Sequence, residues 1–119
     1  MVFDSSLRKR IRNPKGEQLI VSAEEAAKLI KDGMVVGVSG FTPSDDPKVV
    51  PLALATQRNT GEAFKVDIYS GAALGIIDSE MIKAGIVRKR LPFCHNETIR
   101  EAVNSGNLQY IDMHLSQSP

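Results

Sequence analysis

Two short runs of glycine and small polar residues are the segments of this chain best suited to hold a ligand. They are residues 40–48 (GFTPSDDPK) and residues 70–75 (SGAALG). Glycine lets a ligand or another backbone come close, and backbone N–H groups at the start of a helix favour negative charge. The first run therefore resembles an anion cradle, but Asp45 and Asp46 at its mouth would repel a phosphate.

Neither run matches a phosphate-binding fingerprint of the GxGxxG or GxxxxGK[ST] type, so a dinucleotide site is the weaker interpretation. Two interpretations of the first run stay open. It is a structural turn in which an aspartate caps the next helix, or it lines a pocket with Gly40, Phe41 and its backbone amides. For the second run, a ligand-holding loop and a tight strand exit packed under a neighbour are equally good interpretations.

Cys94 and His95 have the residue types of a nucleophile and its base. Adjacent residues rarely present both groups to one substrate atom, because such pairs usually meet through the fold with a third residue orienting the base. We therefore interpret Cys94 as a buried or half-buried thiol. His95 and His114 lie far apart in the chain, and no carboxylate spacing completes a metal site with them.

The acidic residues form no catalytic motif. We place most of them on helix surfaces or helix starts, where solvation and the helix dipole explain them, and we assign no catalytic residue. They are Glu24, Glu25, Asp78, Glu80, Glu97 and Glu101.

Length and composition indicate one small soluble domain of 119 residues, 42% hydrophobic and 24% charged. The formal net charge of +1 argues against nucleic-acid or polybasic membrane partners, which need a dense basic face. A single cysteine excludes an internal disulfide and favours a reduced, cytoplasmic setting. No apolar run approaches the roughly 20 residues of a membrane span, and no secretion signal opens the chain.

Residues 1–20 form a basic arm that we separate from residues 21–119. The arm carries five bases and two acids. A nucleic-acid arm or a weak organelle signal is the less favoured interpretation, because Pro14 and Gly16 break any helix there and Asp4 is unusual in a transit peptide. A solvated arm that packs on a partner surface is the favoured one.

The best-marked element is a helix that starts after Ser22. Ser22 and Glu25 form a capping box, in which each side chain satisfies an orphan backbone donor. Gly33 provides a left-handed stop. The apolar residues recur at helical spacing, and they are Ala23, Ala26, Ala27 and Ile30, with Leu29 beside them.

The remaining elements alternate between strand and helix. A continuous apolar run at 34–38 is typical of a strand covered on both faces. Pro47 begins a helix with Asp46 as its N-cap. We also predict strands at 66–69, 86–87 and 108–111, a helix at 79–84 that ends at Gly85, and a helix capped by Asn96 and closed by Gly106.

This alternation predicts an α/β fold with a mostly parallel sheet, flanking helices and right-handed crossovers. The two glycine-containing runs then lie at carboxyl ends of strands, where ligands bind in such sheets. Only residues 112–119 follow the last strand, with no closing helix. The sequence therefore indicates an incomplete domain, or one completed by another chain.

Several motifs in register over about a hundred residues resemble the acetyl-CoA hydrolase/CoA-transferase family, which includes the succinyl-CoA:acetate CoA-transferases. The residues that carry the resemblance are Arg10–Asn13, Ser39–Ser44, Pro47–Leu54, Ser70–Gly75, Arg90–Phe93 and Tyr110–Ser116. The resemblance covers the N-terminal part of the family and implies a CoA-transferase-like fold built from two related halves.

The resemblance implies covalent chemistry without a permanently bound cofactor and with coenzyme A as a substrate. A glutamate attacks an acyl-CoA thioester, a glutamyl-CoA thioester forms, and an acceptor carboxylate or water completes the cycle. That glutamate belongs to the family's second half, so no catalytic residue is expected in this chain. The implied partners are acyl-CoA, small carboxylates such as acetate, propionate or succinate, the missing half or another chain, and a second copy in a homo-oligomer.

The resemblance carries over only the wall of the carboxylate pocket. The substrate-binding residues that it implies are Gly40, Phe41, Thr42, Gly71, Ala72, Ala73 and His95. The chain departs from the family at three positions. These departures either alter which acceptor carboxylate is bound or indicate a relaxed, non-functional copy. Asp45 stands where the family loop SGFTPSGYPK has Gly, and costs about 1 kcal/mol if that Gly has φ > 0. Ala73 often corresponds to a hydroxyl residue, and His95 to Thr.

Two hypotheses follow. The chain is the N-terminal piece of an acyl-CoA hydrolase/CoA-transferase, inactive alone. The alternative is a non-catalytic α/β module, or truncated product, whose uncovered sheet edge and apolar faces bind a partner protein.

Overall fold

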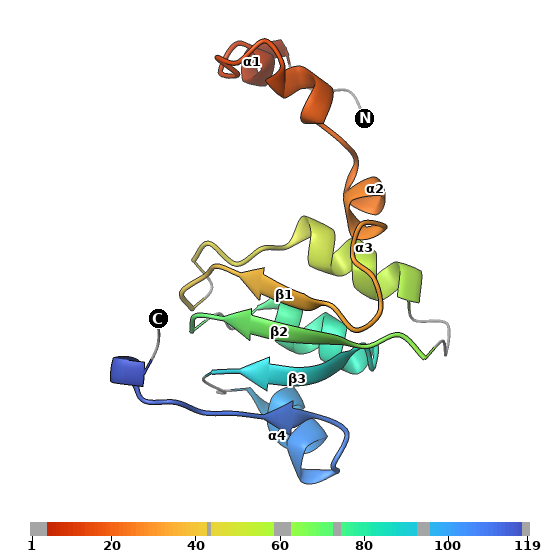
Figure 1. Cartoon of the computed structure of the whole chain (residues 1–119), viewed down its shortest axis with the longest axis vertical. Coiled ribbons are helices and arrows are strands. Elements are labelled where there is room, and N and C mark those ends of the chain that lie inside the picture. Colours follow the sequence, from red (N-terminus) through yellow and green to blue (C-terminus); the bar gives the residue numbers. More distant parts are fainter. Residues whose placement is uncertain (1–4, 43, 59–62, 73–74, 93–95, 118–119) are drawn as a thin grey trace.

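The computed structural model shows an all-parallel sheet of four strands in the order β1-β2-β3-β4 (Figure 1). The structure describes residues 5–42, 44–58, 63–72, 75–92 and 96–117, except for the side chains of Ser5 and Leu115. This confirms the predicted α/β fold class. The strands are β1 (Val35–Val38), β2 (Val66–Ser70), β3 (Val87–Leu91) and β4 (Gln109–Tyr110).

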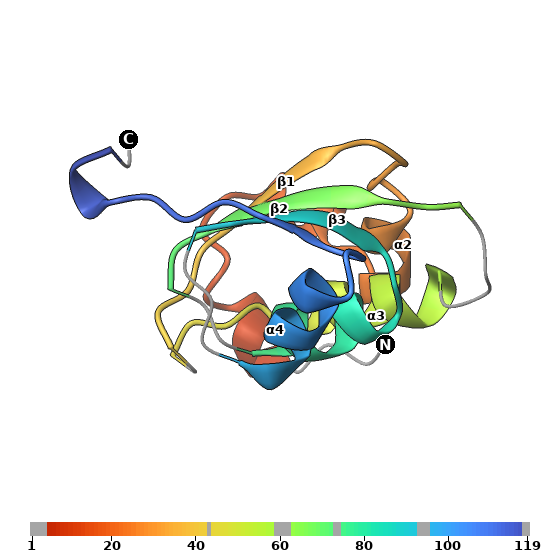
Figure 2. The same cartoon turned by 90° about the horizontal axis from the view of Figure 1, so that it is seen from below.

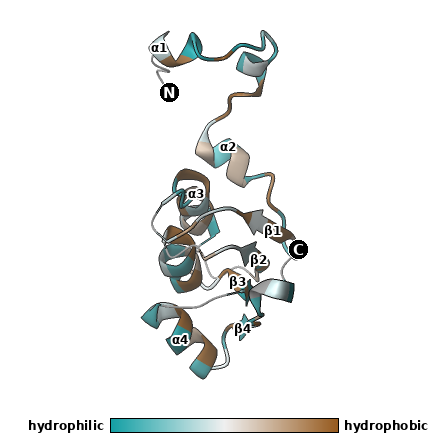
Figure 3. Ribbon diagram, turned by 90° about the vertical axis from the view of Figure 1, so that its left-hand side faces the viewer, coloured by the Kyte–Doolittle hydropathy of each residue, from teal (hydrophilic) through white to brown (hydrophobic). Residues whose placement is uncertain are grey.

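Three helical segments connect successive strands, and all of them cover the same face of the sheet (Figures 2 and 3). They are α3 (Val49–Arg58), the π-helical segment η2 (Ile77–Met81) and α4 (Glu97–Asn104). The other helices are α1 (Ser5–Arg8), the 3-10 helices η1 (Gly16–Leu19) and η3 (Leu115–Gln117), and α2 (Ala23–Ala27). No helix in the described part of the chain is long and apolar enough to cross a membrane.

The predicted helix caps at Ser22 and Asn96 are confirmed. The Ser22 hydroxyl accepts a hydrogen bond from the Glu25 backbone N–H (3.2 Å), and the Glu25 carboxylate accepts one from the Ser22 N–H (2.9 Å). These bonds lower the pKa of Glu25. The Asn96 side chain likewise accepts from the Ile99 N–H (3.1 Å) at the start of α4. Helix α2 ends at Ala27, earlier than predicted, because the next residues form tighter i→i−3 hydrogen bonds.

The hydrophobic core lies between the sheet and this helical layer. On β2, residues Val66 and Ile68 point into it and have no exposed surface, while the intervening Asp67 belongs to the opposite face. The buried members of the core come from every connecting helix, from strands β2 and β3 and from the segments beside them; they include Leu54, Phe64, Val66, Ile68, Ile77, Met81, Ile86, Val87, Ile99 and Leu108.

The opposite face of the sheet is open, which corrects one prediction. The apolar run at 34–38 indicated a strand covered on both faces, but Val35 is 58% exposed and Tyr69, two strand positions from Asp67, is 44% exposed. Strand β1 is also an edge strand. The run is apolar on both faces, yet the 119 residues bury only the face carrying Val36 and Val38.

An ion pair occupies the middle of this open face. The Arg88 guanidinium donates to both oxygens of the Asp67 carboxylate, at 2.8 and 2.9 Å. Asp67 is buried, whereas the Arg88 side chain is 49% exposed. The hydrogen bonds from Arg88 lower the pKa of Asp67.

The lowered pKa of Asp67 predicts an acid-dependent loss of stability. The pair stabilises the fold above the unfolded-state pKa of about 3.9, and this contribution is lost as pH falls through the lower folded-state pKa. Because Arg88 is solvated, we expect about 1 kcal/mol. Urea unfolding between pH 7 and pH 3 should show a shallower acid loss for Asp67→Asn than for the unsubstituted chain. Parallel pH profiles would contradict this.

Candidate functional site

The two glycine-containing loops lie side by side at the carboxyl ends of β1 and β2. The Thr42 N–H donates a hydrogen bond to the Ala72 carbonyl at 2.7 Å. A Cβ atom on Gly71 would lie 3.0 Å from the Gly40 carbonyl oxygen, so the two backbones are in close contact there. The structure thus brings together Gly40, Phe41, Thr42, Gly71 and Ala72 of the predicted site.

The first loop is a tight turn with two strained residues. Phe41 and Ser44 exchange backbone hydrogen bonds of 3.0 and 3.1 Å. Thr42 has φ 52° and Asp45 has φ 56°, both in the left-handed region that favours glycine. A β-branched residue such as Thr42 rarely adopts this conformation. Phe41 itself is 69% exposed beside the turn.

Replacing Asp45 with glycine should stabilise the chain. The sequence analysis predicted strain at position 45 if its φ is positive, and the observed φ is 56°. Asp45→Gly should raise the free energy of unfolding by about 0.5–1 kcal/mol, because glycine adopts this conformation without a Cβ clash. The matched control is Asp112→Gly, at an exposed aspartate outside the left-handed region, which should give no gain in urea unfolding. Equal or lower stability of Asp45→Gly would contradict the strain.

Asp46 ties the first loop to the start of η2. Its carboxylate is turned inward and 7% exposed, and Oδ2 accepts a hydrogen bond from the Ile76 N–H at 3.1 Å. The prediction that Asp46 caps the helix after Pro47 is therefore wrong: α3 begins at Val49, and the carboxylate contacts the next helix along the chain. Only the exposed Asp45 remains at the mouth of the loop.

Gly75 is the residue that makes room for this carboxylate. A Cβ atom at Gly75 would lie 1.9 Å from Asp46 Oδ2 and 2.2 Å from its Cγ. Asp46 Oδ1 is buried without a hydrogen-bond partner among the described residues. The second glycine run is thus a closely packed strand exit as well as a neighbour of the first loop.

A fully buried ion pair lies beside the second loop, where the Asp78 N–H donates a hydrogen bond to the Gly75 carbonyl at 3.1 Å. The Arg90 Nε of β3 donates to Asp78 Oδ1 of η2 at 2.8 Å, and neither side chain has exposed surface. Burial raises the pKa of Asp78, and the bond from Arg90 opposes that effect. Asp78 lies in the first turn of η2, at a helix start as predicted, but the prediction that solvation explains it is wrong because it is fully buried. The negative charge of Asp46 also raises the pKa of Asp78, so the three charges form one buried cluster.

A cavity of about 520 Å³ opens on the uncovered side of the sheet, next to the strand ends. Most of its lining is apolar, and it joins three strands to the C-terminal segment through Met113. The lining residues are Gly37, Val38, Ser39, Tyr69, Ser70, Leu91, Pro92 and Met113. Its position beyond the carboxyl ends of parallel strands is the usual position of a ligand site in an open α/β sheet.

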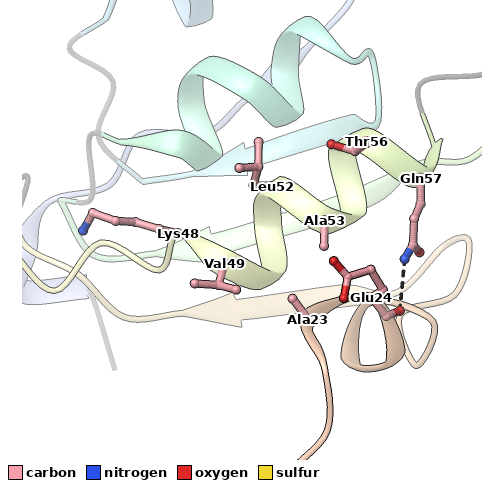
Figure 4. A pocket seen from close by; sticks show the side chains of 8 residues that line it. All are labelled: Ala23, Glu24, Lys48, Val49, Leu52, Ala53, Thr56 and Gln57. Atoms are coloured by element: carbon pink, nitrogen blue, oxygen red, sulfur yellow. Dashed lines mark hydrogen bonds between the residues drawn. The ribbon is translucent and has the colours of Figure 1, made fainter. Parts of the chain in front are cut away.

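A second groove, of about 370 Å³, runs between α2 and α3 (Figure 4). The Gln57 side chain donates to the Glu24 carbonyl at 3.0 Å and joins the two helices there. Lys48 points outward at one end in Figure 4. The walls are mostly small and aliphatic side chains of packed helices, and the groove lies on the helical layer rather than at the strand ends.

The remaining candidate residues from the sequence are not part of the two joined loops as described. Three of them lie outside the described residues: Ala73, Cys94 and His95. His114 is exposed in the C-terminal segment, with Nδ1 2.8 Å from the Ser116 Oγ. Within the described ranges no group of three or more His, Cys, Asp or Glu side chains could hold a metal ion.

Sequence reasoning missed the buried charge cluster. One signal was present: residues 88–90 are all basic and lie in a strand, where alternate side chains face opposite sides. At least one base therefore had to point toward the helical layer, and it needed an acidic partner there. The identity of that partner, Asp78, depends on a contact twelve residues away that no spacing rule gives.

The whole described fold matches a known family profile, the acetyl-CoA hydrolase/transferase N-terminal domain, over residues 5–119. The chain belongs to this family. It is 48% identical over 110 residues to the succinyl-CoA:acetate CoA-transferase of Clostridium kluyveri, which covers 91% of the chain. It is 30% identical over 122 residues to the acetyl-CoA hydrolase of Saccharomyces cerevisiae, across the whole chain.

These relatives are much longer proteins. The chain spans 20% of the C. kluyveri relative and 23% of the S. cerevisiae relative. A propanoyl-CoA:succinate CoA transferase of Escherichia coli, 29% identical over 102 residues, is covered to 21% of its length. The family resemblance is confirmed, and the chain corresponds to a partial domain at the N-terminal end of the family.

Proposed function

We propose that this chain forms one wall of the small-carboxylate pocket of an acyl-CoA hydrolase/CoA-transferase. The observation that supports this most directly is the junction of the two loops at the strand ends, through the 2.7 Å bond from Thr42 to Ala72. The junction presents Gly40, Phe41, Thr42, Gly71 and Ala72 on one side of the sheet edge. We assign Ala73 and His95 to the same wall on the family resemblance.

The proposed chemistry proceeds through a glutamate outside this chain. Its carboxylate attacks the thioester carbonyl of acyl-CoA, the C–S bond breaks, and an acyl-glutamyl anhydride and CoA thiolate form. The thiolate then attacks the glutamyl carbonyl, releasing the carboxylate product and leaving a glutamyl-CoA thioester. An acceptor carboxylate then attacks this thioester and expels CoA thiolate, which attacks the acceptor's acyl carbonyl in the resulting anhydride, so that a new acyl-CoA forms and the glutamate is freed. In the hydrolase reaction, water hydrolyses the thioester to the glutamate and CoA. Acetate, propionate and succinate are the carboxylate class that we propose.

In this scheme the loops of the chain bind and position rather than react. Their exposed backbone and the Phe41 side chain line the pocket, while the buried Asp46 and the Asp78–Arg90 pair hold the loops in place. Coenzyme A is a substrate and no permanently bound cofactor is required. We propose a cytoplasmic reaction, since a chain with one cysteine suits a reduced compartment.

Turnover of the isolated and the completed chain tests this function. The 119-residue chain should not turn over acetyl-, propionyl- or succinyl-CoA with carboxylate acceptors. Joining it to the residues that follow the matched segment in the C. kluyveri relative should produce turnover. Robust turnover by the 119 residues alone would overturn the claim that the nucleophile lies elsewhere.

The non-catalytic module is a second candidate, favoured by the open sheet face and the free edge of β1. Size-exclusion chromatography separates it from the first. A monomer that binds no CoA ester and recruits no second half would support the stand-alone module. Aggregation, rescued by a downstream half, would support the partial enzyme.

A further inference from the structure

One carboxylate of the first loop is exposed and has no counter-ion. Asp45 is exposed to solvent, whereas the neighbouring Asp46 is buried. Within the described part of the chain, no cation forms an ion pair with Asp45. The next cation along the chain is the Lys48 ammonium, which donates to the Asp46 backbone carbonyl at 3.0 Å. The loop therefore presents a negative charge to an anion that approaches it.

The turn holds this charge close to the joined loops. Ser44, the residue before Asp45, exchanges backbone hydrogen bonds of 3.0 and 3.1 Å with Phe41, and Thr42 donates to the Ala72 carbonyl at 2.7 Å. Consecutive Cα atoms are about 3.8 Å apart and bonded pairs about 5.5 Å, so Asp45 lies within about 10 Å of the Phe41 backbone. That is about the Debye length at 0.1 M ionic strength, so a ligand at this wall is within reach of the charge.

The backbone at Asp45 is held from both sides. Ser44 is paired with Phe41, and the buried Asp46 carboxylate accepts a hydrogen bond from the Ile76 N–H at 3.1 Å. Asp45 itself has φ 56°, where an aspartate costs stability that a glycine would not. Strained residues of this kind cluster at ligand sites. The strain and the unpaired charge are two independent observations at one position of the proposed pocket wall.

We propose that Asp45 makes this pocket discriminate against carboxylic acids that carry a second negative charge. The inference rests on the proposed function and narrows its substrate class to monocarboxylates such as acetate and propionate. Repulsion of the reacting carboxylate is common to all acids, and only a dicarboxylate such as succinate adds a second repulsion. Phe41, 69% exposed, offers apolar contact to a methyl or methylene tail but no counter-charge for a distal carboxylate.

Paramagnetic relaxation in the 119-residue chain tests the repulsion without an enzyme assay. The probes are carboxy-PROXYL, a nitroxide that is itself a small carboxylate, and its neutral amide carbamoyl-PROXYL. Their relaxation enhancements are compared at the amides of residues 40–42 and 71–72. The variant is Asp45→Asn, because Asn tolerates the left-handed region as Asp does. The matched control is Glu101→Gln, which removes an exposed carboxylate on α4.

Asp45→Asn should raise the ratio of anionic to neutral enhancement at these amides at least about 1.5-fold at low ionic strength. Glu101→Gln should leave the ratio unchanged. At about 1 M salt the Debye length falls to about 3 Å, and the difference between Asp45 and Asn should disappear. An unchanged ratio in Asp45→Asn, or a change that salt does not remove, would overturn the proposal.

Turnover by the joined chain described under Proposed function tests the selectivity itself. Acetyl-CoA is the donor, and the acceptors are succinate and its monoamide succinamate, which have the same length and differ in the distal charge. Asp45→Asn should raise kcat/KM for succinate relative to succinamate at least about threefold at low ionic strength, and Glu101→Gln should not.

The two kinds of failure are distinguishable. Turnover with a change in the succinate to succinamate ratio below about 1.5-fold would overturn this inference and leave the proposed function standing. Absence of turnover with both acids in every variant would contradict the proposed function. The relaxation ratios of the 119-residue chain would then still support or overturn the repulsion of a carboxylate by Asp45.

Discussion

Asp78→Ala should be one of the most destabilising single substitutions in this chain. The substitution leaves the Arg90 guanidinium buried, with no exposed surface, and without the carboxylate that accepts its 2.8 Å bond. Breaking a buried ion pair by removing one partner costs about 3–5 kcal/mol, a large share of the stability of a small domain. Urea unfolding followed by circular dichroism should show a large fall in the midpoint.

Two controls separate the buried charge from general damage to η2. Glu80→Ala removes the nearby half-exposed carboxylate, whose 3.9 Å pair with Lys83 is solvated, and should change stability by about 0.5 kcal/mol or less. The double variant Asp78→Leu/Arg90→Met removes both charges and should recover much of the loss. A loss under about 1 kcal/mol for Asp78→Ala would show that Arg90 is not buried as described.

Among substitutions that add one methyl group to the two loops, Gly75→Ala should lower the free energy of unfolding most. The added Cβ would lie 1.9 Å from Asp46 Oδ2, so the carboxylate must move and release the Ile76 N–H. Overpacking costs about 1–3 kcal/mol, and a lost hydrogen bond to a charged group about 1.5–3 kcal/mol. We expect a total near 3 kcal/mol by urea unfolding.

A double-mutant cycle identifies the cause. In an Asp46→Ala background the carboxylate is gone, so Gly75→Ala should cost only about 0.5 kcal/mol, and the coupling between the two sites should exceed about 1 kcal/mol. Gly37→Ala, where an added Cβ meets nothing within 4 Å, is the control and should be nearly neutral. Additive effects of Gly75→Ala and Asp46→Ala would exclude the proposed contact.

Local patterns predicted the elements well because their causes are local. The Ser22–Glu25 box and the Asn96 cap act within three residues, and both were confirmed. The stops at Gly85 and Gly106 have φ 71° and 77°. The alternation of strands and helices was sufficient to predict a parallel sheet with its glycine loops at the carboxyl ends.

Long-range relations could not be predicted in the same way. Whether Asp46 caps the following helix or reaches Ile76 depends on how two loops pack, and the sequence favoured the wrong helix. The Asp78–Arg90 pair depends on the same packing. The prediction that β1 is buried on both faces was wrong for a different reason. Its residues are apolar on both faces, but the 119 residues contain helices that cover only one of them.

The location of the covalent intermediate tests the central claim most directly. The chain, joined to the residues that follow the matched segment in the C. kluyveri relative, would be incubated with acyl-CoA, digested and mapped by mass spectrometry. A CoA adduct on a glutamate outside residues 1–119, absent from the isolated chain, is the predicted result. An adduct on a residue within 1–119, or one formed by the isolated chain, would contradict it.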